Sequence, residues 1–191
     1  MIRAFVAAEL DNQVLDNISK LIEILKPRLP AVRWTPKTNL HLTLKFLGNI
    51  EESQVNPVTV QLRASLKLFP RCTINAKGLG VFPDVRRPKI LWVGLSGDLL
   101  AQLAASVEAA LVPLGFTSEN RVFTPHLTIG RWREGSRPTT KLRQEIESWS
   151  RSEFGACAVE QIVLFQSVLR PEGASYSELA IVQLGSDIPG T

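Results

Sequence analysis

The chain contains two histidines, and each of them opens the same short phrase. His41 is followed by Leu-Thr-Leu and His126 by Leu-Thr-Ile, and the two histidines lie 85 residues apart. At ordinary residue frequencies, such a match after a second histidine arises by chance about once in a thousand times. The phrase therefore indicates an internal duplication, which restricts the chain to folds that are built from two similar units.

Other features repeat at the same separation. When the chain is shifted against itself by 85 residues, the apolar helical stripe that starts at Leu15 meets the stripe that starts at Leu100, and Cys72 meets Cys157. The helices in the middle of the two units match poorly. We expect a single domain, 1–191, built from two pseudo-repeats of about 85 residues, 1–85 and 86–170, with a C-terminal strand within 171–191.

Hydrophobic periodicity predicts the elements of each repeat. In the first repeat the expected strands are 2–9, 40–47 and 72–82, and the expected helices are 12–26 and 51–68. In the second repeat the expected strands are 90–95, 125–132, 159–169 and 176–184, and the expected helices are 99–112 and 139–149. We expect the segment 81–89 to join the repeats, which pack as two lobes about an approximate two-fold axis and set His41 opposite His126 across a cleft.

The composition limits the class of protein and its surroundings. The chain has 191 residues, 45% of them hydrophobic and 21% charged, and a formal net charge of +4, which is typical of a globular protein that tolerates an anionic substrate. No apolar run reaches the ~18 residues that cross a bilayer, and Glu9 and Asp11 interrupt the start before a secretion signal forms. We therefore expect no membrane association and a cytoplasmic location. Two cysteines are too few for a disulfide framework or a cysteine-based zinc site.

Each phrase places an imidazole and a hydroxyl on one face of a strand. Residues i and i+2 of a strand point to the same side, so His41 shares a face with Thr43, and His126 shares a face with Thr128. A histidine with a pKa near 6.5 is able to act as base or acid at cellular pH. Two histidines and two neutral donors suit an in-line displacement at phosphorus, in which the hydroxyls bind the non-bridging oxygens.

The residues five positions after the histidines differ between the repeats. Arg131 follows His126, and its guanidinium fork is the usual partner of a phosphate, although the strand needs a bulge or an end to turn it to the same face. Phe46 follows His41 and fits a platform for a nucleobase, but it lies in an apolar run and fits the core equally well. A cation at one end of the site and a ring at the other suit a nucleotide.

These residues resemble the 2H phosphoesterases, specifically the bacterial and archaeal RNA 2′,3′-cyclic phosphodiesterases once described as 2′-5′ RNA ligases. The resemblance covers nearly the whole chain, and the paired His-x-Thr motifs at this separation are its most specific part. The matching blocks are Arg3–Ala7, Asn39–Gly48, Val81–Asp84, Arg87–Gly94, Phe123–Arg131, Leu164–Ser167 and Gly173–Tyr176.

The resemblance implies an α+β fold of two internally duplicated lobes, with a central cleft between antiparallel sheets that are flanked by helices. It implies hydrolysis of 2′,3′-cyclic phosphates to 2′-phosphates without metal or cofactor, on RNA ends or nucleoside 2′,3′-cyclic phosphates. We expect the protein to be a monomer. It implies that His41 and His126 are the acid/base pair and that Thr43 and Thr128 donate hydrogen bonds to the phosphate. It also implies that Arg131 contacts the phosphate or the substrate and that Phe46 contacts the nucleobase. Which histidine is the base stays open.

Two alternatives to this activity stay open. The same site suits a 2′-5′ RNA ligase or a 2′-5′ phosphodiesterase, and a module that binds RNA ends or nucleotides without turnover would keep the same cleft. Intact acid, base and hydroxyl groups in both repeats favour an enzyme. A metallohydrolase is disfavoured, because two histidines with no nearby carboxylate cluster supply too few ligands.

Overall fold

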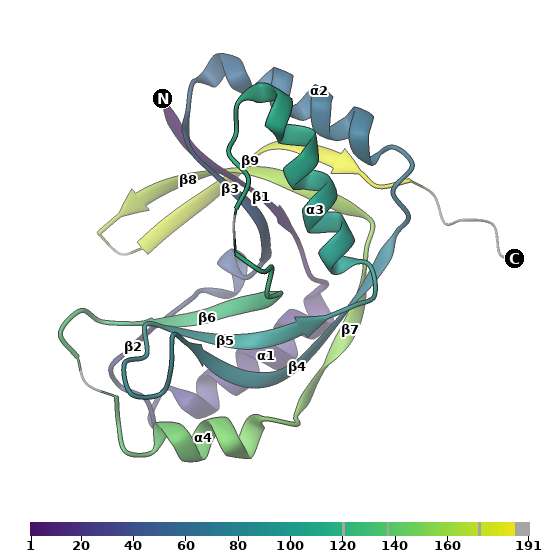
Figure 1. Cartoon of the computed structure of the whole chain (residues 1–191). Helices are drawn as coiled ribbons and strands as arrows, with labels where there is room; N and C mark the ends of the chain where they lie inside the picture. Colours follow the sequence, from purple (N-terminus) through teal and green to yellow (C-terminus); the bar gives the residue numbers. More distant parts are fainter. Residues whose placement is uncertain (120, 137, 172, 186–191) are drawn as a thin grey trace, which may run out of the picture.

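One curled antiparallel sheet runs through the protein, whose computed structural model describes residues 1–119, 121–136, 138–171 and 173–185 (Figure 1). Within these residues nine strands form the sheet: β1 (Ile2–Ala8), β2 (Val32–Trp34), β3 (Leu42–Ile50), β4 (Cys72–Phe82), β5 (Ile90–Ser96), β6 (His126–Trp132), β7 (Glu153–Val159), β8 (Gln161–Arg170) and β9 (Gly173–Gln183). Their order is β7-β4-β5-β6-β3-β1-β8-β9, and β2 pairs with β6.

Helices cover the outer face of the curled sheet. The α-helices are α1 (Asn12–Leu25), α2 (Val55–Leu66), α3 (Leu100–Leu111) and α4 (Leu142–Trp149), and the 3-10 turns are η1 (Lys37–Asn39), η2 (Glu52–Gln54) and η3 (Val112–Leu114). Helices α2 and α3 pack together over the lobe β3-β1-β8-β9, and α1 and α4 pack on β7 and β4 of the lobe β7-β4-β5-β6 (Figure 1). No helix among the described residues has the length and apolar character needed to span a membrane.

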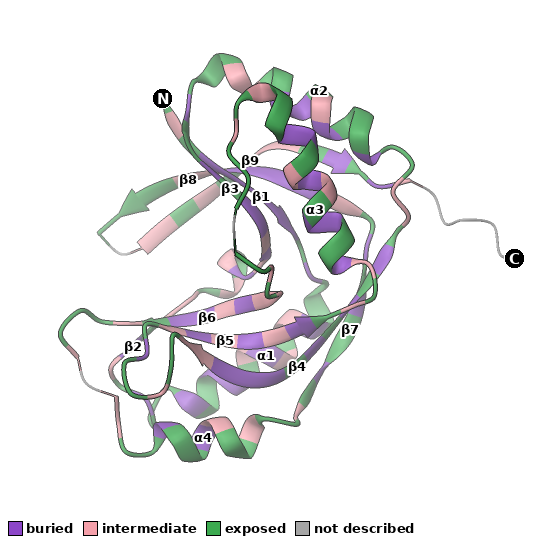
Figure 2. Ribbon diagram, viewed as in Figure 1, coloured by how far each residue is buried: buried purple, intermediate pink, exposed green. Residues whose placement is uncertain are grey.

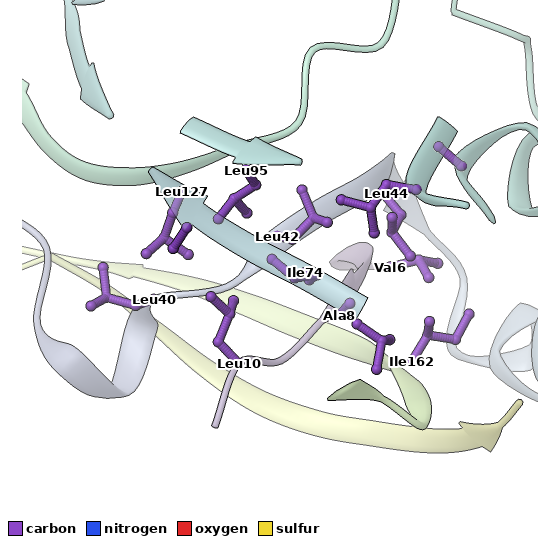
Figure 3. Close-up of a cluster of buried hydrophobic side chains, with 14 of the residues drawn as sticks. Val6, Ala8, Leu10, Leu40, Leu42, Leu44, Ile74, Leu95, Leu127 and Ile162 are labelled. Atoms are coloured by element: carbon purple, nitrogen blue, oxygen red, sulfur yellow. The ribbon is translucent and has the colours of Figure 1, made fainter. Parts of the chain in front are cut away.

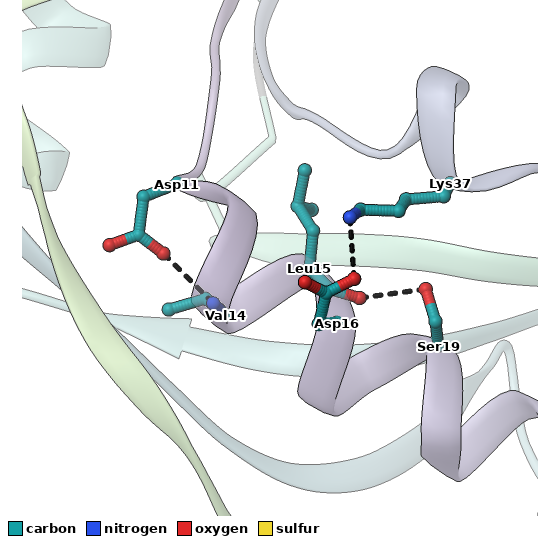
Figure 4. Close-up of polar contacts among 6 residues, drawn as sticks. All are labelled: Asp11, Val14, Leu15, Asp16, Ser19 and Lys37. Carbon is teal, nitrogen blue, oxygen red and sulfur yellow. Dashed lines mark hydrogen bonds and ion pairs between the residues drawn. The ribbon is translucent and has the colours of Figure 1, made fainter.

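Helix α1 shows how local sequence sets the segment before His41. The carboxylate of Asp11 caps the helix by accepting a hydrogen bond from the backbone N–H of Val14 at 2.8 Å (Figure 4). The side chain of Lys37 forms an ion pair with Asp16 on the exposed side of the helix (Figure 4). Lys37 belongs to the turn η1, so this contact ties the approach to the first motif strand to α1.

The main core lies between the sheet and its helices. Buried side chains line the strands and the inner sides of the helices, while the solvent sides of the helices are exposed (Figure 2). Leu42 and Leu127, with 1% and 0% of their surfaces exposed, both belong to this core, and Figure 3 shows them in one cluster of it. The apolar residue inside each motif therefore anchors its strand, and the histidine and threonine on either side of it point to the opposite face.

The expected α+β fold of two lobes is confirmed, but the lobes are not the two sequence repeats. Strands β4 and β7 come from different repeats and pair with each other in one lobe, and β1 and β8 do the same in the other. The segment 81–89 connects β4 to β5 within one lobe instead of joining two lobes. A short connection between sequential strands favours their pairing as neighbours, which explains this exchange. The two half-sheets are also continuous, because β3 pairs with β6.

The expected elements are present with small shifts of their ends, and two strands are additional. Strand β4 has the expected bounds, whereas the expected helix 51–68 begins as the turn η2 and becomes α-helical only at Val55. The additional strands are β2 and β7. Strand β2 has three residues, which is too short for a periodic signal, and β7 contains Gly155, a residue that weakens a strand pattern.

Candidate active site

A single residue pair connects the two motif strands. Leu42 of β3 pairs with Leu127 of β6 in an antiparallel register. When this register is extended by one residue each way, His41 lies across from Thr128, and Thr43 lies across from His126. The register places the histidines crosswise: each faces the threonine of the other motif, and the four side chains share the inner face of the sheet.

Both histidine rings are oriented by the backbone two residues earlier. Nδ1 of His126 lies 2.7 Å from the carbonyl oxygen of Thr124, which accepts only, so Nδ1 carries a proton and Nε2 is the nitrogen left for the site. The backbone of Asn39 makes the corresponding hydrogen bond with His41. Asn39 and Thr124 are themselves 85 residues apart. The repeat thus gives each histidine a backbone partner two residues earlier in the chain.

A β-bulge in β3 turns Phe46 to the inner face. Thr43 lies opposite Ala7, and Lys45 lies opposite the adjacent residue Val6, so Leu44 is an extra residue without a partner in β1. This bulge reverses the alternation after Leu44. Phe46 consequently shares the face of Thr43, and Lys45 points to the outer, helix-covered face.

A second bulge in β6 does the same for Arg131. Thr128 lies opposite Trp92, but Gly130 lies opposite the adjacent residue of β5, so Ile129 is extra. Arg131 therefore shares the face of Thr128. The two bulges lie 85 residues apart, and each one moves the fifth residue after a histidine into the site.

Aromatic rings enclose His41. The imidazole stacks on Phe5 with ring centroids 4.8 Å apart, and the ring of Tyr176 meets it edge-on at 5.2 Å. Phe165 lies at 6.1 Å and, together with Phe5, belongs to a small buried cluster separate from the main core. Burial among these rings lowers the pKa of His41 to about 4; the hydrogen bond with Asn39 raises it, and the charge of Arg131 lowers it further. His41 is therefore neutral at pH 7 in the substrate-free protein.

The surroundings of His126 are different. Phe82 meets its ring edge-on, with centroids 5.0 Å apart and planes at 88°. The indole of Trp92 lies 5.1 Å from Phe82 and covers Gly80, where a Cβ would come within 2.2 Å of the indole. Glycine is therefore required at position 80 for this wall of the site. The two histidines have equivalent backbones but distinct environments.

The structure brings all six predicted site residues to the inner face. Phe46 is 56% exposed and its ring lies 6.1 Å from that of Phe5, so it is a surface residue at the site and not part of the core. Arg131 is exposed, and its charge acts on His41 and also on the hydroxyl of Tyr176. Burial raises the pKa of Tyr176, while the charges of Arg131 and Arg3 lower it.

Sequence reasoning missed the aromatic neighbours of the histidines. Tyr176 is the only tyrosine of the chain and follows Gly173-Ala-Ser in one of the matching blocks, which was the available signal. Phe5 and Phe82 also stand in matching blocks, but apolar strand residues give no sign of which face they occupy. Across the ranges that the structure describes, no three His, Cys, Asp or Glu side chains gather in a group able to hold a metal ion.

Paired His-x-Thr strands on the inner face of a duplicated antiparallel sheet are the mark of a two-histidine phosphoesterase. The family of LigT-like phosphoesterases matches residues 9–92 and again residues 93–176, so the chain belongs to this family. The two successive matches confirm the duplication and the family resemblance seen in the sequence. They cover most of the chain, including both histidine motifs.

Relatives with similar sequences extend over nearly the full length. The RNA 2′,3′-cyclic phosphodiesterase of Methanothermobacter thermautotrophicus is 32% identical over 184 residues, which cover 96% of this chain and 99% of the relative. The RNA 2′,3′-cyclic phosphodiesterase of Aquifex aeolicus is 34% identical over 191 residues, which cover 97% and 98%. Both relatives are named for the activity that the sequence analysis expected.

Solved structures show the same fold. The protein TT0787 of Thermus thermophilus superposes with a TM-score of 0.82 at 22% identity, covering 98% of this chain and all of that one. E. coli LigT, solved in complex with 3′-AMP, superposes with a TM-score of 0.74 at 24% identity, covering 96% and 98%. The expected fold class is thereby confirmed.

Proposed function

We propose that this protein is an RNA 2′,3′-cyclic phosphodiesterase, which hydrolyses a 2′,3′-cyclic phosphate to a 2′-phosphomonoester. One observation supports the proposal above all: Leu42 pairs with Leu127, and from this register we infer that two imidazoles and two hydroxyls stand together on the inner face. The full-length relatives that bear this activity in their names support it.

In the proposed reaction, water attacks the phosphorus of the cyclic diester. One histidine accepts a proton from the water, the bond from phosphorus to the 3′ oxygen breaks, and the other histidine donates a proton to that oxygen. The products are a 2′-phosphate and a free 3′ hydroxyl. His41, neutral at pH 7 in the free protein, is ready to accept a proton; it donates one only if the bound anion raises its pKa.

The remaining predicted residues have roles that fit their positions. The hydroxyls of Thr43 and Thr128, each across from a histidine, donate hydrogen bonds to the non-bridging oxygens. Arg131 binds the same phosphate through its planar fork and stabilises the negative charge that develops on it. The exposed ring of Phe46 stacks on the nucleobase.

We further propose that the reaction needs no metal, because two imidazoles supply both proton transfers. All proposed groups come from one chain, which supports activity as a monomer. We retain the division of the single domain 1–191 into pseudo-repeats 1–85 and 86–170 with a C-terminal strand in 171–191, and a cytoplasmic location, as predictions of the sequence. The repeats are units of sequence that exchange strands in the folded lobes.

The test is to incubate the protein with a nucleoside 2′,3′-cyclic phosphate in excess EDTA and to identify the product by phosphorus NMR. We expect only the 2′-phosphate. Loss of turnover that a divalent ion restores would place the protein in another class. Binding without turnover would support a nucleotide-binding module, and cleavage of a 2′-5′-linked dinucleotide alone would support a 2′-5′ phosphodiesterase.

A further inference from the structure

A second arginine lies beside Arg131 on the inner face. Strand β2 pairs with β6 so that Arg33 stands directly opposite Arg131. Directly opposed residues of an antiparallel pair project to the same side of the sheet. The side chain of Arg33 therefore joins the face that carries Thr128 and Arg131, although 98 residues of sequence separate the two arginines.

The two opposed arginines form no ion pair with the acidic residues that the structure describes. Among the residues that the structure describes, seven ion pairs form, and neither Arg33 nor Arg131 takes part in any of them. Like charges directly opposite each other destabilise a sheet. An anion bound between the two guanidinium groups removes this repulsion, whereas a purely structural role leaves it uncompensated.

The Arg33 side chain is also held in place. Its Nη2 donates a hydrogen bond to the carbonyl oxygen of Pro171 at 3.1 Å, in the connection between β8 and β9 of the other lobe. A Cβ added at Gly173 would lie 3.3 Å from the same nitrogen. Asn39 adds a second tie close to this connection, since its Nδ2 donates to the carbonyl oxygen of Ala174, at the start of β9, at 2.7 Å. One hydrogen bond uses one of the five N–H groups of Arg33 and leaves the others for a ligand.

Arg33 and Phe46 lie at opposite ends of the site. Strands β3 and β6 are antiparallel, so the step from Leu42 to Phe46 and the step from Leu127 to Arg131 lead in opposite directions. Strand β2 extends the Arg131 end. A nucleotide whose cyclic phosphate lies between the histidines and whose base reaches Phe46 directs its 5′ side toward Arg33.

We propose that Arg33, which stands beside Arg131, forms a subsite for the phosphate that precedes the terminal nucleotide of an RNA chain. This inference rests on the proposed function and adds to it a preference for an oligonucleotide end over a free cyclic mononucleotide. Arg33 is a specificity residue here, since the phosphate that it binds takes no part in the reaction.

The experiment compares a trinucleotide that ends in a 2′,3′-cyclic phosphate with the corresponding nucleoside 2′,3′-cyclic phosphate. In Arg33→Gln the ratio of kcat/KM for the trinucleotide to kcat/KM for the mononucleotide falls about tenfold, because a charged hydrogen bond is lost on one substrate only. The trinucleotide's plot of log kcat/KM against log salt concentration becomes shallower by about 0.7, as expected for one fewer phosphate contact with a single strand. Arg33→Lys keeps the charge and loses less of the ratio.

Arg63→Gln is the matched control. Arg63 is an exposed arginine of α2 whose Nη2 also donates to a backbone carbonyl, that of Ile181, at 3.2 Å. Its loss removes the same charge and the same kind of hydrogen bond away from the inner face, so the ratio stays at the wild-type value. An unchanged ratio in Arg33→Gln, or an equal fall in both variants, would overturn the subsite.

Binding separates this inference from the proposed function. If the wild-type protein hydrolyses neither substrate, the proposed function fails, and fluorescence anisotropy of a labelled trinucleotide with a 2′-phosphate end decides the subsite. A dissociation constant about tenfold higher for Arg33→Gln than for Arg63→Gln supports the subsite. Equal dissociation constants for the two variants would overturn it.

Discussion

Leu42 pairs with Leu127, the residue that holds the same place in the second repeat. When equivalent residues of two antiparallel strands pair with each other, the approximate two-fold axis of the duplication passes between them. The axis therefore runs through the centre of the site. Each histidine and threonine of one motif is matched by its counterpart across the axis, and this is why histidine and threonine from different repeats face each other.

Arg131 stands on the inner face because of a bulge, and its role is testable by substitution. Arg131→Ala lowers kcat/KM for a cyclic nucleotide about 100-fold with a large part in kcat, because the guanidinium stabilises charge that develops in the transition state. Arg131→Lys recovers part of the loss, since an ammonium lacks the fork. The substitution to alanine also raises the pKa of His41, whose lowering owes a part to this charge. Steady-state kinetics across pH measure both effects, and an unchanged kcat would remove Arg131 from the site.

Phe46 is expected to affect binding and not the chemical step. Phe46→Ala raises KM for a nucleotide by the equivalent of about 1 to 3 kcal/mol, the contribution of a base on an aromatic ring, and leaves kcat nearly constant. A cyclic phosphate without a base serves as the internal control and shows little change. Equal losses on the two substrates would mean that Phe46 supports the strand and not the base.

Much of this arrangement follows from the sequence alone. The repeat of His-Leu-Thr is enough to predict the duplication, the motif strands and the face shared by each histidine and threonine, because alternation along a strand is a local property. The order of helices and strands follows from periodicity in the same way. The polar residues of the site and the buried leucines beside them can thus be predicted without a structure.

Other features depend on pairing between distant segments. The exchange of β4 and β8 between lobes and the crosswise facing of His41 and Thr128 are set by strand register, which no local pattern records. The sequence does not indicate the bulges at Leu44 and Ile129, so the face that Phe46 occupies could not be predicted, and a place in the core and a role as a stacking platform fitted equally well. Arg33 lies in a three-residue strand, and only its pairing with β6 brings it to the inner face.

His41 makes the stability of the protein depend on pH. The pKa of His41 is about 4 in the folded chain and near 6.5 when unfolded, so between these values the unfolded chain binds a proton that the folded chain does not. Stability therefore falls as pH falls through this window, by about 2 kcal/mol between pH 7 and pH 5. Urea unfolding of wild type and His41→Gln measures it, with His126→Gln as the control. If His41→Gln lost as much stability as wild type, His41 would not be the group responsible.

The outer side of the β3 bulge carries a buried ion pair. Lys45 is 2% exposed; its Nζ donates to Glu108 of α3 at 2.6 Å and to the carbonyl oxygen of Thr117 at 2.8 Å. Glu108→Gln leaves the buried ammonium without its counter-charge and destabilises the protein by about 3 kcal/mol in denaturant unfolding. The matched change Glu153→Gln breaks an exposed pair with Lys77 and costs less than about 1 kcal/mol. Equal effects of the two substitutions would contradict a special role for the buried pair.

The central claim is that the two histidines act together in one reaction, and turnover of the single and double variants tests it directly. With a nucleoside 2′,3′-cyclic phosphate as substrate, His41→Ala and His126→Ala are each expected to lower kcat by at least about 100-fold, because neither proton transfer replaces the other. The double variant is expected to lose little more than either single variant, since the two groups act as a unit. A kcat near the wild-type value in either single variant, or losses that multiply in the double variant, would contradict the account.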